Sequence, residues 1–593
     1  MTNDEWDDLV RRRAQQAKSD PRGYRVRVWA WALGGYAILL GTLGLAVACV
    51  AGLVLAIFAE APTVLFFAKP GIAIGVLAFT VLRALAVKLP PPSGIELRAA
   101  DAPALFDTIE RLRAQLHAPR VDHVLIDGDF NASIVQVPRF GPLGWERNYL
   151  TLGLAYMQTL SREQFTSVLA HELGHISRSH GRFAVWIYHL RHSWSSVMNA
   201  LDEHGFAGSG VARRLFGWYV PRLQACTVAL VREHELEADR AAAEAVGARH
   251  AALALLRSAA LGPAVDRYWD GVYRRMHHDP APPRAVFSGV ADAVRAASHA
   301  DGEAAVDREL ALPTETTDMH PALSERLAAL GYGAGALDVA DALWPPALPA
   351  ADALLGRDAH ARLAERLSSR WSHSLQDTWI ERHAAAAIDR EQLDRLEDAA
   401  AAGSLDLASA NERAEIVADL HDDDAALAAW RDVLELDPAG ARANLAVGGR
   451  LLERGDDAGL AHVDRAIEAS PAMALSAAEI GYDYLAGRGR HDEAARYRAL
   501  VNRQLGVLDA AAEERRVLRK SDELVAHGLA PEAVAALSAS LAGIDRVTRA
   551  YVARRHVVVD AALPGDFFAI PLGRNRWLRR RLDSIDGALI YGR

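Results

Sequence analysis

Two long apolar runs stand out in the hydrophobic pattern near the start of the chain. Residues 28–59 are 32 consecutive positions without a charged residue. This run exceeds the roughly twenty residues that span a bilayer and is too long for the core of a signal peptide, so it predicts a transmembrane helix. The second run, residues 61–87, is interrupted by Lys69, Pro70 and Arg83. It predicts a second crossing, or alternatively a helix that lies against the membrane surface.

The pattern then changes to helical periodicity. Ser161 followed by Gln164 has the spacing of a helix N-cap and its capping-box partner, and apolar residues recur at helical spacing from Phe165 to Ile176, which predicts a partly buried helix. Other short elements are predicted by β-branched content or apolar periodicity. They are strands at residues 134–137 and 149–154, and helices at residues 183–190 and 215–230.

The C-terminal third is rich in alanine and has helical segments separated by proline. Leu436-Asp437-Pro438 is followed 33 residues later by Ala469-Ser470-Pro471, close to the 34-residue period of tetratricopeptide repeats. We predict two to three degenerate repeats of this type within residues 411–510, with a surface for protein partners. A plain alanine-rich helical bundle is the alternative. Residues 557–559 and 567–570 predict short strands in a region, 511–593, that has no assigned role.

The charge distribution bears on topology and on partners. Residues 1–27 carry seven basic and five acidic residues, whereas at most one lysine lies between the two apolar runs. The positive-inside rule then places this basic tail in the cytoplasm, and a hairpin returns the following domain to the same side. We expect an integral protein of a bacterial-type inner or plasma membrane. The net charge of −10 argues against nucleic acid as a partner.

Candidate chemistry lies within the predicted helix, in the pentad His171-Glu172-Leu173-Gly174-His175. Histidines four positions apart share one helix face, so both can bind one metal ion while Glu172 acts beside it as a general base. The pattern is typical of zinc-assisted hydrolysis. The alternative is a core helix with two hydrogen-bonded histidines.

A catalytic zinc takes three protein ligands and keeps one position for water, so a third ligand is required. The segment 232–239 offers several, and its spacing does not choose among Glu233, Glu235 and Glu237. A charge run of this kind is more often a solvated helix face than a site.

The combination of HELGH and a downstream ExxAD resembles the integral-membrane zinc peptidases that include bacterial HtpX and the CAAX prenyl proteases. The resemblance implies that Glu235 is the third ligand and that Asp239 orients a ligand histidine. Arg232 fits the start of this second motif, although Val231 stands where the family has serine. The resemblance spans about residues 95–345.

Two further motifs match the same family on either side of these helices. Asn131-Ala132-Ser133 resembles its NAF or NAS element, which implies a strand that borders the active-site cleft. Residues 134–137 have strand propensity, and an exposed edge there could pair with an extended substrate backbone. His320 and Arg326 match its HPxxxxR element, which implies that His320 stabilises the oxyanion and that Arg326 braces the site. Without the resemblance, His320 would be read as a loop residue before a proline.

Together these patterns predict a mainly α (α+β) protein with N-terminal transmembrane helices, a zincin-like helical peptidase domain with a small β-sheet, and a C-terminal helical repeat-like domain. The predicted segments are a cytosolic tail (1–27), a transmembrane hairpin (28–88), a peptidase domain (89–345), a helical linker (346–410), repeats (411–510) and the C-terminal region (511–593).

The predicted function is a membrane-anchored endopeptidase with one Zn²⁺ per chain. It would cleave proteins or peptides, as the resemblance implies, in the quality control or processing of membrane proteins. The alternative is a non-catalytic repeat scaffold or chaperone with a structural metal site. Prenyl-protein processing would use the same chemistry, but the chain lacks the many spans of those enzymes.

Overall fold

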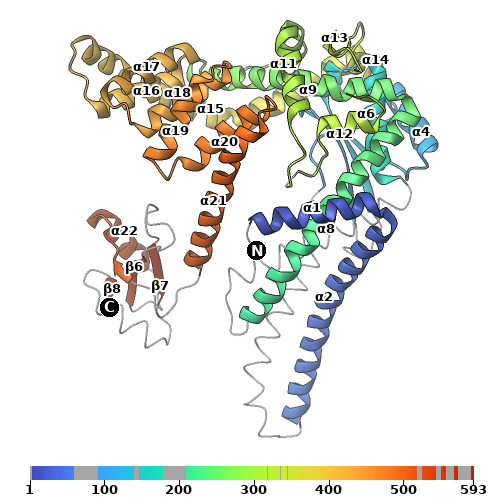
Figure 1. The fold of residues 1–593 in the computed structure, drawn as a ribbon, viewed down its shortest axis with the longest axis horizontal. Coiled ribbons are helices and arrows are strands. Elements are labelled where there is room, and N and C mark those ends of the chain that lie inside the picture. The colour runs from blue at the N-terminus through green and yellow to red at the C-terminus, as the bar shows by residue number, and fades with distance from the viewer. Residues whose placement is uncertain are drawn as a thin grey trace. The chain divides into compact units, whose positions relative to one another are not determined.

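A computed structural model gives the fold, and the residues that it describes lie in eleven ranges. These are 3–58, 91–138, 146–177, 209–316, 318–333, 336–343, 345–516, 524–542, 549–555, 567–571 and 589–592. The described chain is mainly helical with two small sheets (Figure 1), which confirms the predicted fold class at this level. The predicted helix at residues 183–190 and the strand at 557–559 lie outside the described residues.

The chain divides into two compact units. The first contains Asn3–Ala426 and Leu485–Arg490, and the second contains Leu427–Tyr484 and His491–Arg593. All residues of the candidate site belong to the first unit.

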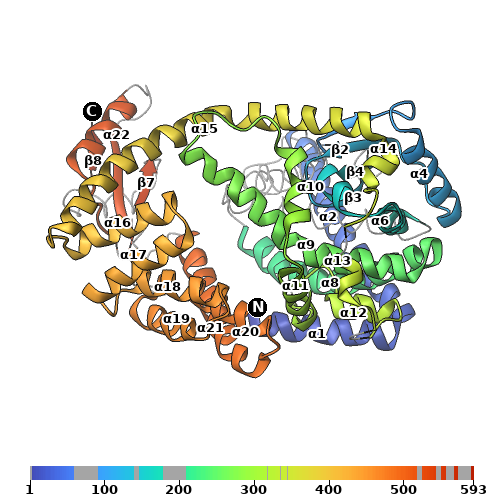
Figure 2. The same ribbon diagram turned by 90° about the horizontal axis from the view of Figure 1, so that it is seen from above.

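Helices make up most of the first unit. They are α1 (Asn3–Ser19), α2 (Pro21–Phe58), α4 (Pro103–Leu116), α5 (Leu154–Thr159), α6 (Arg162–Ile176), α8 (Ser209–Val246), α9 (Ala248–Arg274), η2 (Arg275–His277), α10 (Val286–Ala296), α11 (His299–Ala311), α12 (Leu323–Ala329), α13 (Val339–Leu343), α14 (Ala350–Leu355), α15 (Arg357–Ala401), α16 (Leu407–Leu420) and the start of α17 (Asp423–Leu436). In Figure 2, α6 lies beside the sheet, and the two are in contact.

The sheet of the first unit has four strands in the order β1-β2-β4-β3. The strands are β1 (Ile95–Leu97), β2 (His123–Asp127), β3 (Ala132–Pro138) and β4 (Glu146–Gly153). β2 and β4 run parallel, whereas β1 and β3 are antiparallel to their neighbours. β3 is therefore an edge strand among the described strands, and it contains the predicted strand 134–137. The strand predicted at 149–154 is β4, which begins earlier and gives way to α5 at Leu154.

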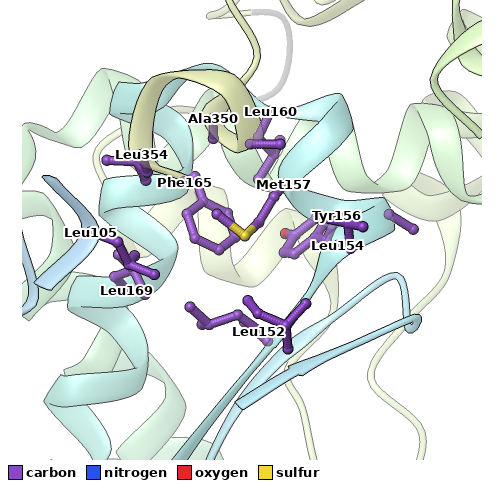
Figure 3. Close-up of a cluster of buried hydrophobic side chains, with 14 of the residues drawn as sticks. Leu105, Leu152, Leu154, Tyr156, Met157, Leu160, Phe165, Leu169, Ala350 and Leu354 are labelled. Atoms are coloured by element: carbon purple, nitrogen blue, oxygen red, sulfur yellow. The ribbon is translucent and has the colours of Figure 1, made fainter. Parts of the chain in front are cut away.

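The core beside this sheet holds α6 in place. Leu152 of β4, Met157 of α5 and Phe165 of α6 are fully buried and lie together in one cluster (Figure 3). Leu105 of α4 and Leu354 of α14 belong to the same cluster and are also buried. Burial of one large apolar side chain contributes about 1.5–3 kcal/mol, so this cluster stabilises the sheet and the helix that carries the candidate ligands as one body.

The N-terminal helices pack on α8. α1 crosses α8 (Figure 1), and Tyr24 near the start of α2 donates a hydrogen bond to the carbonyl of Cys226 in α8 at 2.8 Å. Among the described residues, no helix combines the length and the apolar character needed to cross a membrane. The predicted crossing by residues 28–59 thus has no support from the described helices, and the second apolar run, residues 61–87, lies outside the described residues.

The second unit contains the rest of α17, a series of helices and a small sheet. Its helices are α18 (Ala441–Glu453), α19 (Ala458–Ala469), α20 (Ala474–Ala486), α21 (His491–Arg516) and α22 (Pro531–Ala542), and its strands are β5 (Leu524–Ala526), β6 (Arg549–Arg555), β7 (Phe567–Pro571) and β8 (Leu589–Gly592). α18 and α19 form a helical hairpin, and β7 contains the strand predicted at 567–570. The tetratricopeptide assignment and its protein partners stay predictions.

Candidate metal centre

Local sequence fixes both the start of α6 and its approach to α8. Ser161 Oγ accepts a hydrogen bond from Gln164 N at 3.2 Å, and Gln164 Oε1 accepts one from Ser161 N at 2.9 Å. This confirms the predicted capping box. Near the other end of α6, a Cβ at Gly174 would lie 3.2 Å from Ala238 Cα in α8. The small residues therefore allow the two helices to meet closely where both carry candidate ligands.

Three candidate ligand side chains converge between α6 and α8. His171 Nε2 and His175 Nε2 are 3.1 Å apart. Glu235 Oε2 lies 3.6 Å from His171 Nε2, and Glu235 Oε1 lies 3.4 Å from His175 Nε2. Glu235 is buried, with 6% of its side chain exposed, so the solvated-face interpretation is wrong for this residue.

The spacing of these three donors fits a zinc ion. Ligand atoms about 2.0–2.1 Å from a tetrahedral zinc lie about 3.3 Å from one another. The two imidazole nitrogens are 3.1 Å apart, and each lies 3.4–3.6 Å from one of the two Glu235 oxygens, close to that value. Two imidazoles and one carboxylate are also a donor set that catalytic zinc uses. The residues present therefore fit the metal that the sequence predicts.

Asp239 and Arg326 fix the orientation of His171 through hydrogen bonds on the side away from the candidate metal position. Asp239 Oδ1 lies 2.9 Å from His171 Nδ1, which fixes the tautomer that leaves Nε2 free for a metal. Arg326 of α12 makes a bidentate ion pair with the same carboxylate, with Nε 2.8 Å from Oδ2 and Nη2 2.6 Å from Oδ1. Planar guanidinium–carboxylate pairs of this kind restrict both partners in orientation, so Arg326 braces the ligand histidine through Asp239.

The charges around the centre are strongly coupled. Burial alone would lower the pKa of His171, but hydrogen bonds with Asp239 and Glu235 outweigh it and raise the pKa to about 9, so a metal that binds Nε2 must displace a proton from it. Burial and the neighbouring His171 lower the pKa of His175 to about 3. Burial opposes ionisation of Glu235, but hydrogen bonds from His171 and His320 hold its pKa well below the usual range. The carboxylate is thus kept ionised, as a metal ligand must be.

Glu172 lies beside the donors on the neighbouring face of α6. Its carboxylate comes within 4.8 Å of the His171 and His175 ligand atoms, and its Oε2 accepts a hydrogen bond from the backbone N of Ile134 in β3 at 3.0 Å. Burial raises the pKa of Glu172 to about 7. A carboxylate with a pKa near neutrality can take up and release a proton at working pH, which is what a general base requires.

His320 reaches the centre from the loop between α11 and α12. Its Nδ1 lies 2.8 Å from Glu235 Oε2, and 68% of its side chain is exposed. The hydrogen bond with Glu235 raises the pKa of His320. The reading of His320 as only a loop residue before proline is therefore incomplete, because the side chain contacts a candidate ligand.

A cavity of about 310 Å³ opens over these groups. Asn131, Ala132 and Ser133 line it from the start of β3, where Ala132 pairs with Leu152 of β4 and Ser133 pairs with Thr151. The three residues matched to the NAS element thus lie beside the candidate ligands.

Other residues that line this cavity were not predicted from the sequence as site residues. Tyr156 of α5 lines the cavity and exchanges a 2.6 Å hydrogen bond with Ser258 of α9. The apolar part of the wall comes from Val168, Ala242, Ala251, Ala254 and Leu255. No motif distinguishes these positions from ordinary core residues. The strand predicted at 134–137 indicates only that backbone groups such as Ile134 N lie near the site.

Comparison with known proteins agrees with this geometry. Residues 143–333 match the model of peptidase family M48. The matched range includes the HExxH helix, Glu235, Asp239, His320 and Arg326, and it covers less than half of the chain. No curated protein sequence matches the chain significantly. The family match supports a metallopeptidase function for this part of the chain.

Proposed function

We propose that the protein is a zinc-dependent endopeptidase. The observation that carries the proposal is the convergence of His171, His175 and Glu235 at tetrahedral spacing, with Glu172 beside them and a cavity over all four. A closed structural zinc site has four protein ligands and no use for a general base. An arrangement with three ligands, a base and an adjoining cavity therefore favours catalysis over the alternative scaffold function.

The residues divide the hydrolytic work among them. Zinc held by His171, His175 and Glu235 would acidify a water molecule and polarise the substrate carbonyl. Glu172 takes the proton from the attacking water and delivers it to the leaving amine. His320 uses Nδ1 for Glu235, which leaves its other ring nitrogen to donate toward negative charge that develops on the carbonyl oxygen.

The edge strand β3 gives a reason to expect polypeptide substrates. Ile134 N points to Glu172 and not to β4, so the outer edge of β3 runs past the proposed base. An extended peptide that added beside this edge would satisfy its own backbone groups and place a carbonyl near the centre. We propose that such substrates include membrane proteins undergoing processing or quality control.

The function is tested by metal exchange in a cleavage assay. Purified protein should contain one zinc per chain and cleave casein, a chelator should abolish cleavage, and stoichiometric zinc should restore it, because the acidified water depends on the metal. Zinc content is measured by elemental analysis and cleavage by release of soluble peptides. Cleavage that persists in protein stripped of metal would contradict the proposal.

We also propose that α2 attaches the protein to a membrane, with the peptidase domain on the cytoplasmic side. Residues 28–58 carry no charge, and Leu33, Leu40 and Val47 are 55%, 58% and 61% exposed. Large apolar side chains that face outward along one helix favour a lipid environment. The excess of basic residues before this segment favours a cytoplasmic position for α1, and α1 packs on α8 of the peptidase domain.

Replacing Leu33, Leu40 and Val47 together by asparagine should move the protein from the membrane pellet to the supernatant in cell fractionation, since lipid contact no longer offsets the polar groups. The matched control replaces Ile380 and Ile388 of α15 by asparagine, because these two isoleucines are 51% and 67% exposed. This control should leave the distribution of the protein between pellet and supernatant unchanged. An equal shift for both sets, or wild-type protein found entirely in the supernatant, would refute attachment by α2.

A further inference from the structure

The loop that carries His320 is also held by the N-terminal helix. Thr316 Oγ1 donates a hydrogen bond to the carboxylate of Asp7 in α1. Both residues are buried, each with about 8% exposed. A hydrogen bond to an ionised acceptor in a buried setting is among the stronger ones, so the contact joins the N-terminus to a loop more than three hundred residues away in sequence.

Apolar packing strengthens the same contact. Val10 of α1 is fully buried against Ala225 and Val228 of α8. Trp6 and Met319 pack against this small cluster. Met319 immediately precedes His320, so the cluster places α1 next to the residue that contacts Glu235.

The described residues of the loop are hydrogen-bonded to one another and to α8. Glu315 N donates to Asp318 Oδ2 at 2.7 Å, and Ala322 N donates to Thr314 Oγ1 at 2.7 Å. Arg232 of α8 donates to the carbonyl of Asp318 from Nε at 3.0 Å and from Nη2 at 2.8 Å. Thr316 lies between Glu315 and Asp318, which are hydrogen-bonded to each other, so we expect a displacement at Thr316 to change the position of His320.

Within the part of the chain that the structure describes, the His320 loop is contacted by Arg232 of α8, the helix that carries Glu235, and by α1. We propose that α1 regulates the catalytic centre by positioning this loop, so that release of α1 lowers turnover without removing the metal. Asp7 and Thr316 are its positioning residues. This inference rests on the proposed peptidase function. It also links the centre to α2, because α1 ends at Ser19 and α2 begins at Pro21.

Thr316→Val tests the proposal in the full-length zinc-loaded protein, since valine keeps the shape of threonine and removes the donor. We expect kcat to fall by about tenfold to a hundredfold, the factor by which loss of one buried hydrogen bond to a charged group would depopulate the active position of the loop. KM and zinc content should stay within about twofold of wild type, and hydrogen exchange over residues 312–322 should become faster. Thr316→Ser restores the hydroxyl and should return kcat close to wild type.

Two further variants complete the test. Met319→Ala weakens only the apolar contact with the cluster around Val10 and should also lower kcat. This variant tests the proposal independently if Thr316→Val does not fold. Asp8→Asn is the matched control, because Asp8 is exposed and pairs with Arg11 within α1, and it should not change kcat.

Wild-type kcat and unchanged loop exchange in both Thr316→Val and Met319→Ala would overturn the proposal. Loss of zinc in step with loss of activity would overturn it as well, because the contact would then maintain the metal centre as a whole. If wild-type protein neither bound zinc nor cleaved casein, the peptidase function would fail. Faster loop exchange in Thr316→Val would still report the contact between α1 and the loop in that case.

Discussion

Glu172→Gln should lower kcat by about a hundredfold to ten-thousandfold while zinc content stays at the wild-type level, as expected for loss of a general base. Glutamine keeps the size of the side chain and can still accept the hydrogen bond that Ile134 N donates to Glu172 Oε2. It cannot take up a proton from water. The substitution therefore separates the chemical step from the folding of the site.

The matched control for this variant is Glu163→Gln, the same change on an exposed residue in the first turn of the same helix. It should leave kcat unchanged. The measurements are turnover of casein or a fluorogenic peptide, together with zinc per chain. Wild-type turnover in Glu172→Gln would rule out the assigned mechanism, and loss of zinc would mean that Glu172 serves as a ligand.

Local patterns in the sequence were sufficient for the elements nearest the site. The capping box at Ser161 and the apolar spacing that follows it predict α6, because both signals depend only on neighbours three or four residues away. The same spacing places His171, Glu172 and His175 on one helix, and the structure has them there. β-branched residues predict the middle of β3, whose full extent is Ala132–Pro138.

The third ligand could not be chosen by local reasoning. Glu233, Glu235 and Glu237 have the same chemistry and lie on one helix, and which of them faces α6 depends on which face of α8 packs against α6. The packing of the two helices includes a close contact between Gly174 and Ala238. These residues are far apart in the sequence, so no local pattern predicts the contact. Only the resemblance to known peptidases singled out Glu235.

The position of His320 depends on contacts even more remote in sequence. Its loop is held by Arg232 and by α1, and no periodic pattern connects residues 7 and 316. The part of the cavity wall that α9 contributes could not be predicted either. It consists of Ala251, Ala254 and Leu255, which follow the spacing of ordinary helical core residues. Only tertiary packing brings these residues next to the candidate ligands.

Glu235→Ala should remove most of the bound zinc, and with it the cleavage activity. It deletes one of three ligands, so the loss of affinity should exceed the roughly ten- to hundredfold that follows loss of an outer partner of a ligand. It also takes away the carboxylate that contacts both His171 and His320. Zinc per chain after gel filtration and competition with a chromogenic chelator measure the effect, and circular dichroism with thermal melting shows that the fold persists.

Glu233→Ala and Glu237→Ala provide the comparison, because both residues belong to α8 and point to other partners. Glu233 Oε1 lies 3.3 Å from Arg240 Nη2, and Glu237 forms an ion pair with Arg25 of α2. Each of the two side chains is 28% exposed, whereas that of Glu235 is 6% exposed. Partly exposed ion pairs contribute at most about 1 kcal/mol, so both variants should fold and keep nearly all their zinc. Zinc loss in Glu237→Ala equal to that in Glu235→Ala would show that the ligand has been assigned in the wrong register of the helix.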